Sequence, residues 1–378
     1  MIVSPMDMYS AVDGVPGDFH LVHLGSKAMG GAGLVMTEMV CVSPEGRITP
    51  GCTGLWNDEQ RDSWARIVEF AHSRSTARIG LQLGHSGRKG STRLMWEGMD
   101  EPLPDGNWET VGPSPLPYGS GSPVPRPIDR DEMDRITAEF VASARRGADA
   151  GFDLLELHCA HGYLLSSFLS PIANQRMDEY GGSVENRLRY PLEVFDAVRA
   201  AWPAERPMIV RISATDWVPD GNTEHDAVEI ARAFIAHGAN AIDVSSGQVT
   251  ADERPAYGRS YQTPFADRIR QEVTGAAVIA VGAIASYDDV NSNLLAGRAD
   301  LCAIGRTHLY DPHWTLHAAA EQDYRGAEWP VQFQAGSRKP PTARTDAVRP
   351  RLSLLRADAP DRDVHLRWTP HREPATLS

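Results

Sequence analysis

Two histidines three residues apart stand at the end of a short apolar run. The segment 158–164 reads HCAHGYL and follows the run LLEL at 154–157. Two imidazoles and a phenol at this spacing can converge on one small volume. A neutral histidine pair can bind a metal ion, but no third ligand with suitable spacing stands nearby. Alternatively, both imidazoles donate hydrogen bonds to one carbonyl oxygen and stabilise the negative charge that develops there when hydride adds to a conjugated carbon.

Polar residues also close other apolar runs. Gln82 ends the run IGLQ, Arg211 lies within IVRI, and Ser245 follows AIDV. Alternate side chains of a barrel strand point inward, so these residues and His158 are expected to face the mouth at the carboxyl ends of the strands. An unpaired arginine there is costly enough to imply an anionic or acceptor-rich partner. No carboxylate pair suited to glycoside hydrolysis accompanies the set, which predicts a receptacle for a flat heterocycle with several acceptors.

The elements that must position these side chains alternate between short aliphatic runs and longer segments of helical period, a pattern typical of a parallel α/β fold. Strands are expected near 2–4, 34–40, 78–84, 153–158, 208–212, 240–245, 277–281 and 300–304. Eight strands joined by helical crossovers favour a closed (β/α)8 TIM barrel over an open doubly wound sheet. Apolar residues repeat at helical spacing over 133–144 and 188–202, which predicts packing surfaces of crossover helices.

Two segments interrupt this alternation. The first, 96–128, is a Pro/Gly-rich insertion after the third strand, too irregular for a helix or strand. It is expected to lie over the barrel mouth, the alternative being a surface excursion without contact to substrate. The second, 335–378, mixes Arg, Pro, Asp and Ser without periodicity, which predicts a disordered tail or, alternatively, a docking arm for a neighbouring subunit. The barrel domain is expected to span residues 1–334.

Bulk composition narrows the choice of partners. The chain has 378 residues, 42% of them apolar, and a formal net charge of −13. This acidic balance argues against nucleic acid, because a phosphate backbone requires a basic face, and favours a small-molecule substrate. No apolar stretch is long enough to span a bilayer and no signal peptide is recognisable, so a cytoplasmic protein without membrane contact is expected. Reduced, unmetallated thiols are predicted, because no CxxC pair is formed by Cys41, Cys52, Cys159 and Cys302.

Five motifs, in the same order along the chain, resemble the Old Yellow Enzyme flavoproteins over about residues 2 to 333. They are SPM at 4–6, EGRI at 45–48, QLGHSGRK at 82–89, HCAHGYL at 158–164 and DEYGGSVENR at 178–187. The last two are long, so chance similarity is remote. The resemblance implies non-covalent FMN as cofactor and NADH or NADPH as hydride donor.

The resemblance also implies which residues hold FMN. Those expected around its ring are Pro5, Met6, Met39, Gln82 and Arg211. Arg211 corresponds to the cation near the flavin N1 and C2 carbonyl. The residues that match the family's phosphate site are Gly282, Gly305 and Arg306, in agreement with the phosphate binding often found after the last two strands of such barrels.

By the same resemblance, His158 and His161 hold the substrate's carbonyl oxygen, and Tyr163 donates a proton to the carbon beside that carbonyl. Tyr9 matches a tyrosine that lines the substrate side in one branch of the family. The alternative for Tyr9 is a packed aromatic whose hydroxyl bonds to backbone. The implied reaction carries hydride from NADH or NADPH through flavin to the C=C bond of an α,β-unsaturated carbonyl compound or of a dearomatised aromatic acyl thioester.

Three features depart from the family pattern. Asp7 stands where one branch keeps a cysteine that tunes the flavin, and an ionised carboxylate there would disfavour an anionic reduced flavin. The residues after Phe333 lack the arginine that this branch inserts into a neighbouring subunit. The sequence therefore does not decide whether the chain forms a homo-oligomer. The chain enters directly in its first strand, and SPMDMYS at 4–10 is similar to the reductase half of bifunctional salicylyl-CoA and aminobenzoyl-CoA hydroxylases. The alternatives are therefore a flavin dehydrogenase or demethylase of the same superfamily, and a non-catalytic flavin-binding module fused to, or partnered with, a monooxygenase.

Overall fold

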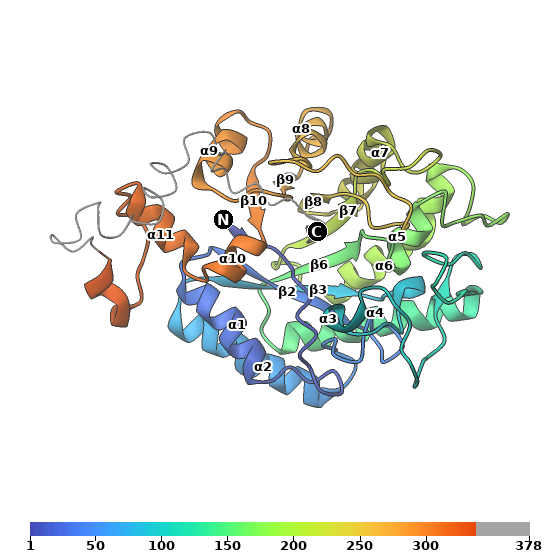
Figure 1. The fold of residues 1–378 in the computed structure, drawn as a ribbon, viewed down its shortest axis with the longest axis horizontal. Helices are drawn as coiled ribbons and strands as arrows, with labels where there is room; N and C mark the ends of the chain where they lie inside the picture. Colours follow the sequence, from blue (N-terminus) through green and yellow to red (C-terminus); the bar gives the residue numbers. More distant parts are fainter. Residues whose placement is uncertain (338–378) are drawn as a thin grey trace, which may run out of the picture.

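Eight parallel strands close into a barrel in the computed structural model, which describes residues 1–337 (Figure 1). They are β1 Ile2–Val3, β2 Leu34–Cys41, β3 Arg78–Gly84, β6 Leu154–Cys159, β7 Met208–Ser213, β8 Ala241–Ser245, β9 Ala277–Ala280 and β10 Leu301–Ile304. Around the barrel the order is β1-β10-β9-β8-β7-β6-β3-β2. Each strand expected from the sequence is present, so the predicted (β/α)8 barrel is confirmed.

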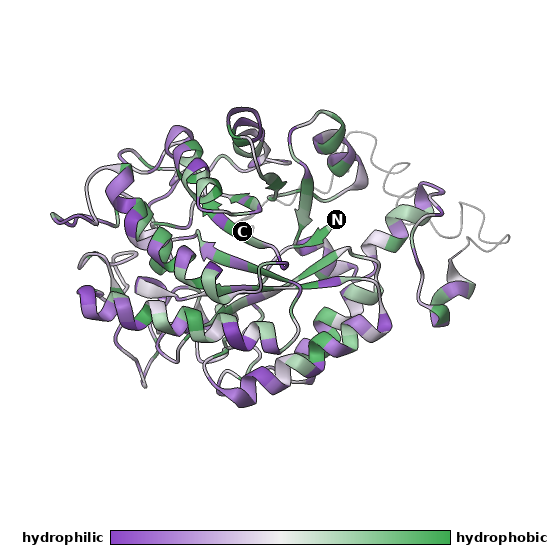
Figure 2. Cartoon of the chain, turned by 180° about the vertical axis from the view of Figure 1, so that it is seen from behind, coloured by the Kyte–Doolittle hydropathy of each residue, from purple (hydrophilic) through white to green (hydrophobic). Residues whose placement is uncertain are grey.

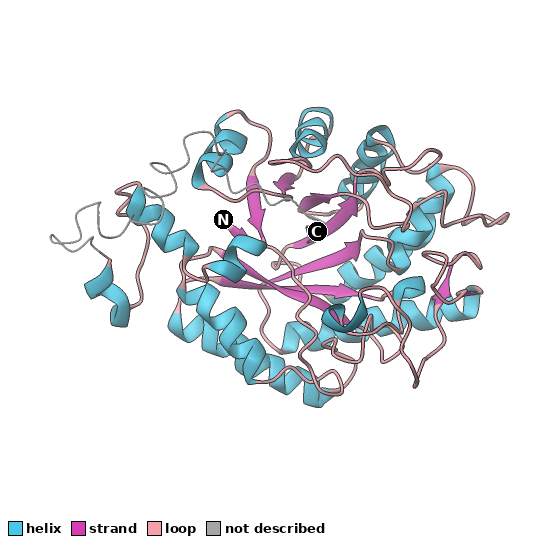
Figure 3. Ribbon diagram, viewed as in Figure 1, coloured by secondary structure: helices cyan, strands magenta, loops and turns pink. Residues whose placement is uncertain are grey.

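Helices connect the strands and surround the barrel (Figure 3). They are α1 Asp18–Met29, α2 Asp58–Arg74, α4 Arg130–Asp149, α5 Leu164–Leu169, α6 Val184–Ala201, α7 Glu224–Ala236, α8 Thr263–Glu272 and α9 Tyr287–Leu295. Local sequence fixes several starts. Asn57, Asp129 and Thr223 each accept a hydrogen bond from the backbone N–H three residues on, and the side chain at that third position reaches back to the cap.

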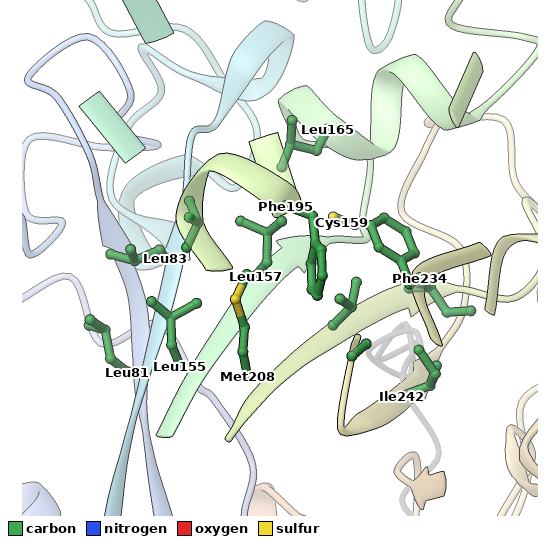
Figure 4. Packing of buried hydrophobic residues seen from close by; sticks show 14 of the residues in the cluster. Leu81, Leu83, Leu155, Leu157, Cys159, Leu165, Phe195, Met208, Phe234 and Ile242 are labelled. Atoms are coloured by element: carbon green, nitrogen blue, oxygen red, sulfur yellow. The ribbon is translucent and has the colours of Figure 1, made fainter. Parts of the chain in front are cut away.

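The strands separate two apolar regions. Outward-facing side chains such as Leu155, Leu157 and Met208 pack against the helices, where α6 contributes Phe195 and α7 contributes Phe234 (Figure 4). Colouring by hydropathy shows mainly hydrophobic strands and helices with hydrophilic outer sides (Figure 2). Inside the barrel a smaller apolar cluster forms a floor, and its members include Ile2, Met36, Ile209, Ala241, Ile279 and Ala303, with Leu154 packed against them. The inward-facing side chains above this floor are polar.

The insertion after β3 is less irregular than the sequence predicts. It contains α3 Met95–Gly98 and a pair of short strands, β4 Val111–Gly112 and β5 Arg126–Pro127. Each spans only two to four residues, too few for periodicity to reveal. The insertion lies against the barrel mouth: the rings of Trp96 and Tyr9 approach to 6.5 Å, and Arg88 donates both to the carbonyl oxygen of Leu116 and to that of Val249 beyond β8.

After β10 the chain forms α10 Arg306–Tyr310, α11 Trp314–Glu321 and the 3₁₀ helix η2 Val331–Gly336. Of the tail predicted over 335–378, residues 335 and 336 lie in η2, and residues 338–378 are outside the described residues. Over residues 1–337, none of the helices combines the length and apolar character that a membrane span requires.

Candidate functional site

A layer of polar side chains lies directly above the apolar floor. Alternation along β7 places Ile209 in the floor and Arg211 one step higher, with Glu156 on β6, Asp243 on β8 and Gln82 on β3 around it. Each of these four polar residues is at most 6% exposed. Gln82 Nε2 donates to Glu156 Oε1 over 2.6 Å, and Arg211 Nη1 lies 3.3 Å from Asp243 Oδ2. The barrel interior is therefore polar just below its mouth.

One expectation about this layer is wrong, and one feature of it was not expected. Arg211 is not unpaired, because Asp243 faces it, although the buried Arg211 Nε has no hydrogen-bond partner in the protein. A buried carboxyl pair is also present, since Glu156 and Asp243 hydrogen-bond to each other. Direct contact leaves no space for a sugar between them, so glycoside hydrolysis stays excluded. The period of two along β6 and β8 puts Glu156 on the same side as His158 and Asp243 on the same side as Ser245, so the sequence does carry a signal for this pair.

His158 and His161 meet above this layer, as the sequence predicts. His158 Nε2 lies 3.3 Å from His161 Nδ1. The Ala160 backbone N–H donates to His158 Nδ1 over 3.2 Å, and His161 Nε2 lies 2.7 Å from Ser245 Oγ. Burial, followed by the charge of Arg211, lowers the pKa of both imidazoles well below the usual value, so both are neutral at pH 7. No group of three His, Cys, Asp or Glu within residues 1–337 is arranged to hold a metal ion.

Tyr163 stands beside the histidine pair, at the residue that precedes α5. Its ring centroid is 5.0 Å from that of His158 and 6.4 Å from that of His161. Burial raises the pKa of the phenol well above its usual range, so Tyr163 keeps its proton at neutral pH. Three of the residues predicted to contact substrate, His158, His161 and Tyr163, are thus brought together at the mouth.

Lys89 is a functional candidate that sequence reasoning missed, although it lies within a quoted motif. Its Nζ is 5.4 Å from the ring centroid of Tyr163 and 4.2 Å from that of Tyr118 in the insertion. It donates to the carbonyl oxygens of His161 over 3.2 Å and of Gln248 over 3.0 Å. Burial lowers the pKa of this amine to about 8. In the sequence, only its place within the motif QLGHSGRK points to Lys89. No sequence pattern predicts that residue 89 lies beside residues 161 and 248.

The loops that Lys89 joins are conformationally demanding. His161 and Gln248 have φ values of 63° and 64°, the left-handed region that non-glycine residues rarely occupy. Gly162, which follows His161, has a φ of 73°, and a Cβ there would lie 2.5 Å from the carbonyl oxygen of Gln248. A side chain at this position would therefore overlap with the loop after β8. The turn that carries His161 and Tyr163 is therefore pressed against the loop after β8.

Asp7 and Met39 are joined at the edge of the site. The register between β2 and β3 shifts between Met36 and Met39, and the Met39 backbone N–H donates to Asp7 Oδ1 over 3.1 Å. Burial, and then the nearby carboxylate of Glu38, raises the pKa of Asp7 to about 7. Glu38 itself lies 3.0 Å from His20 Nε2. A carboxyl group that titrates near neutral pH therefore stands among the residues predicted to surround the flavin ring.

The other predicted ring and phosphate residues lie around the same mouth. Gly282 follows β9 and Gly305 follows β10, and these strands are neighbours. Met6 reaches Gly305, where a Cβ would lie 3.4 Å from the Met6 sulfur. Gly282 has a φ of 105°, a conformation that side chains rarely adopt, and a Cβ there would lie 2.3 Å from Gln262 Nε2.

Arg306, Pro5 and Tyr9 complete the predicted set. Arg306 directly follows Gly305 and is exposed, whereas Pro5 and Tyr9 are partly buried in the segment after β1. Tyr9 packs against the cluster that contains Met39 and Tyr163. The predicted residues thus lie at the carboxyl ends of the strands or in the segments that follow them, and their roles remain predictions.

A cavity of about 420 Å³ opens beside this surface, between the insertion and the loop after β8. Its lining includes Asp100, Glu101, Tyr118, Gln248 and Glu253. Tyr118 and Gln248 are the residues that contact Lys89, so the cavity adjoins the histidine and tyrosine cluster.

Comparison with known protein families assigns the chain to a family. The family model described as the NADH:flavin oxidoreductase / NADH oxidase family matches residues 1–324. The chain belongs to this family. It is thus a member of the Old Yellow Enzyme family, as the sequence motifs predict, and an oxidoreductase that uses FMN and a nicotinamide hydride donor.

Curated and solved relatives agree with the assignment to the NADH:flavin oxidoreductase family. An NADPH dehydrogenase of Geobacillus thermodenitrificans (strain NG80-2) is 39% identical over 340 residues, covering 89% of this chain and 94% of the relative. The structure of morphinone reductase is 27% identical with a TM-score of 0.71, covering 89% of this chain and 88% of that one. A 2-naphthoyl-CoA reductase complex, 22% identical with a TM-score of 0.75, shares the fold over 87% of this chain and 50% of its own.

The site also fits FMN on a structural observation that does not depend on resemblance. The buried Arg211 Nε is a donor without a partner in the protein, and an acceptor-rich ring at the mouth would satisfy it. Met39 is in register with Gln82 on the neighbouring strand, Met6 lies beside Gly305, and Gly282 and Gly305 lie where two neighbouring strands end.

Proposed function

We propose that this flavoprotein reduces the C=C bond of an α,β-unsaturated carbonyl compound, with His158 and His161 binding the carbonyl oxygen and Tyr163 acting as the acid. The observation that carries the proposal is the pair of neutral imidazole nitrogens 3.3 Å apart beside a protonated phenol. Two neutral N–H donors that converge on one point suit an oxygen on which negative charge develops.

Hydrogen bonds set which nitrogens can donate. His158 Nδ1 accepts from the Ala160 backbone, so the neutral ring carries its proton on Nε2. If Ser245 donates its hydroxyl proton to His161 Nε2, that ring carries its proton on Nδ1. His158 Nε2–H and His161 Nδ1–H then both point into the space between the rings. A carbonyl oxygen entering there replaces the contact between the two nitrogens with two hydrogen bonds.

Tyr163 provides the proton. Because burial keeps its phenol protonated, it can donate to the carbon beside the carbonyl when hydride adds to the far carbon. Lys89, 5.4 Å from the ring centroid, places a positive charge near the phenolate that results. The proton is restored to Tyr163 after each turnover.

The cofactor site follows from the same arrangement. Bound FMN supplies the hydride that it has received from NADH or NADPH. Gln82 and Arg211 would hold its ring from below, Pro5, Met6 and Met39 would border it, and Gly282, Gly305 and Arg306 would hold its phosphate. The cavity beside Tyr118 would receive the part of the substrate beyond its carbonyl.

Two substrate classes share this chemistry. A cyclic enone and a dearomatised aromatic acyl thioester both present a carbonyl oxygen to the histidines and a conjugated carbon to the flavin. Both are therefore included in the proposal, and the experiment separates them.

The test is an anaerobic two-step measurement of flavin absorbance. NADPH should bleach the FMN, and 2-cyclohexenone or the CoA thioester of a dearomatised aromatic acid should restore its absorbance. His158→Ala and His161→Ala should retain FMN but slow the second step by about 10²- to 10³-fold. Tyr163→Phe should slow it as well, whereas Tyr190→Phe, which loses a buried hydroxyl bonded to the Met133 carbonyl far from the mouth, should not. Protein that takes up no FMN, or reduced protein that neither substrate reoxidises, refutes the proposal.

A further inference from the structure

The two carboxyl groups inside the barrel cannot both be ionised in the arrangement observed. Glu156 and Asp243 hydrogen-bond to each other, and each is at most 2% exposed. A hydrogen bond between two carboxyl groups requires a proton on one of them. Two carboxylates in contact would repel strongly at the low dielectric of this interior.

The neighbours decide where that proton resides. Arg211 Nη1 lies 3.3 Å from Asp243 Oδ2, which favours the ionised form of Asp243. Glu156 accepts from Gln82 Nε2, a neutral donor. Arg211 also lowers the pKa of Glu156, but burial and the charge of Asp243, which both raise it, are the larger effects. Glu156 in turn raises the pKa of the Cys159 thiol on the same strand. Glu156 is therefore the member that keeps the proton, and Asp243 is the carboxylate paired with Arg211.

We propose that Glu156, as a carboxylic acid bonded to the Asp243 carboxylate, is a positioning residue that sets the charge beneath the flavin ring. With one proton on the pair, the layer of Gln82, Glu156, Arg211 and Asp243 carries no net charge, and Arg211 keeps its Nε free for an acceptor above it. If Glu156 loses that proton, the layer carries a net charge of −1 and faces the ring with an additional anion. The inference rests on the proposed FMN site for its effect, although the shared proton itself does not depend on bound flavin.

The pKa of Glu156 sets the pH range in which the charge of the layer changes. Burial, followed by the charge of Asp243, raises the pKa of Glu156 from its usual value to about 8. When a bound ring gains negative charge on reduction, Glu156 should hold its proton more tightly. Reduction above about pH 8 should then be accompanied by uptake of one additional proton, which Glu156→Gln cannot provide.

The first experiment uses the flavin-free protein and infrared spectroscopy of carboxyl groups. The wild-type protein should show, at pH 6.5, the carbonyl band of a protonated carboxylic acid that is missing in Glu156→Gln and that disappears with a midpoint near pH 8. Asp7→Asn, which removes a different carboxyl group with a raised pKa, should keep this band. If no band at pH 6.5 depends on Glu156, the shared proton does not exist and the inference is overturned.

The second experiment measures the flavin midpoint potential from pH 6.5 to 9.5. Just above pH 8 the wild-type potential should fall more steeply than that of Glu156→Gln, by about 30 mV per pH unit, the equivalent of one proton per two electrons. Equal slopes for the two proteins overturn the role assigned to Glu156. Protein that binds no FMN refutes the proposed function instead, while the infrared result still decides whether the proton is shared. Gln at this position keeps both a donor for Asp243 and an acceptor for Gln82, so the variant preserves the hydrogen bonds of the layer.

Discussion

Replacing Gly162 with alanine would test the close approach that holds the histidine turn in place. Gly162 has a φ of 73°, and a Cβ there would lie 2.5 Å from the carbonyl oxygen of Gln248 and 2.9 Å from the Cα of Val249. Both neighbours are backbone atoms, which cannot rotate away. The left-handed conformation alone costs alanine about 1–2 kcal/mol. The overlap adds about 1–3 kcal/mol, the usual cost of inserting a methyl group into a packed region.

Gly182→Ala is the matched control. Gly182 also has a positive φ, 86°, but nothing lies within 4 Å of the position that a Cβ would occupy. This variant should lose only the conformational part, about 1–2 kcal/mol. The difference between the two variants therefore isolates the contact between Gly162 and the loop after β8.

Two assays read out the comparison. Urea unfolding should show a free energy of unfolding about 1–3 kcal/mol lower for Gly162→Ala than for Gly182→Ala. Because the turn also carries His161 and Tyr163, only Gly162→Ala should slow reoxidation of bound flavin by 2-cyclohexenone. If both variants lose the same stability and reoxidise equally fast, the turn is not pressed against Gln248 and the reasoning fails.

Three further predictions follow from the geometry of the mouth. Arg211→Ala should weaken FMN binding by about 1.5–3 kcal/mol, the worth of hydrogen bonds from a charged donor, and a dissociation constant that stays within twofold of wild type would contradict its place at the ring. Ser245→Ala should leave FMN bound but weaken inhibition by a phenolate anion that mimics the substrate oxygen, because His161 loses the hydroxyl that sets its tautomer. Unchanged inhibition at constant FMN content would exclude that role for Ser245. The pKa of Asp7 rises from 3.8 to about 7 on folding, so the folded state binds more protons than the unfolded state between these values and stability falls as pH rises through that window. Asp7→Asn should therefore gain stability relative to wild type from pH 4 to pH 7, by no more than about 1.4 kcal/mol per pH unit, and a difference in unfolding free energy that does not change with pH would show that Asp7 is not perturbed.

Much of the architecture was readable from short-range patterns. Strand positions follow from apolar runs bounded by polar ends, and helix starts follow from residues such as Asn57, Asp129 and Thr223. Inward-facing polar residues such as Gln82 and His158 were also readable, because the period of a strand fixes the side on which each residue lies. The short elements of the insertion were not, since two to four residues show no period.

The sequence by itself determined which side chains face the barrel mouth and, through motifs such as HCAHGYL, which family the chain joins. Only the tertiary structure decided how those side chains pair: that Arg211 meets Asp243, that Gln82 donates to Glu156, and that Lys89 holds the carbonyls of His161 and Gln248. The reason is physical. Alternation along a strand is a local property of the backbone, whereas charge pairing and pKa depend on distances between strands far apart in the chain, and closure of the barrel sets those distances.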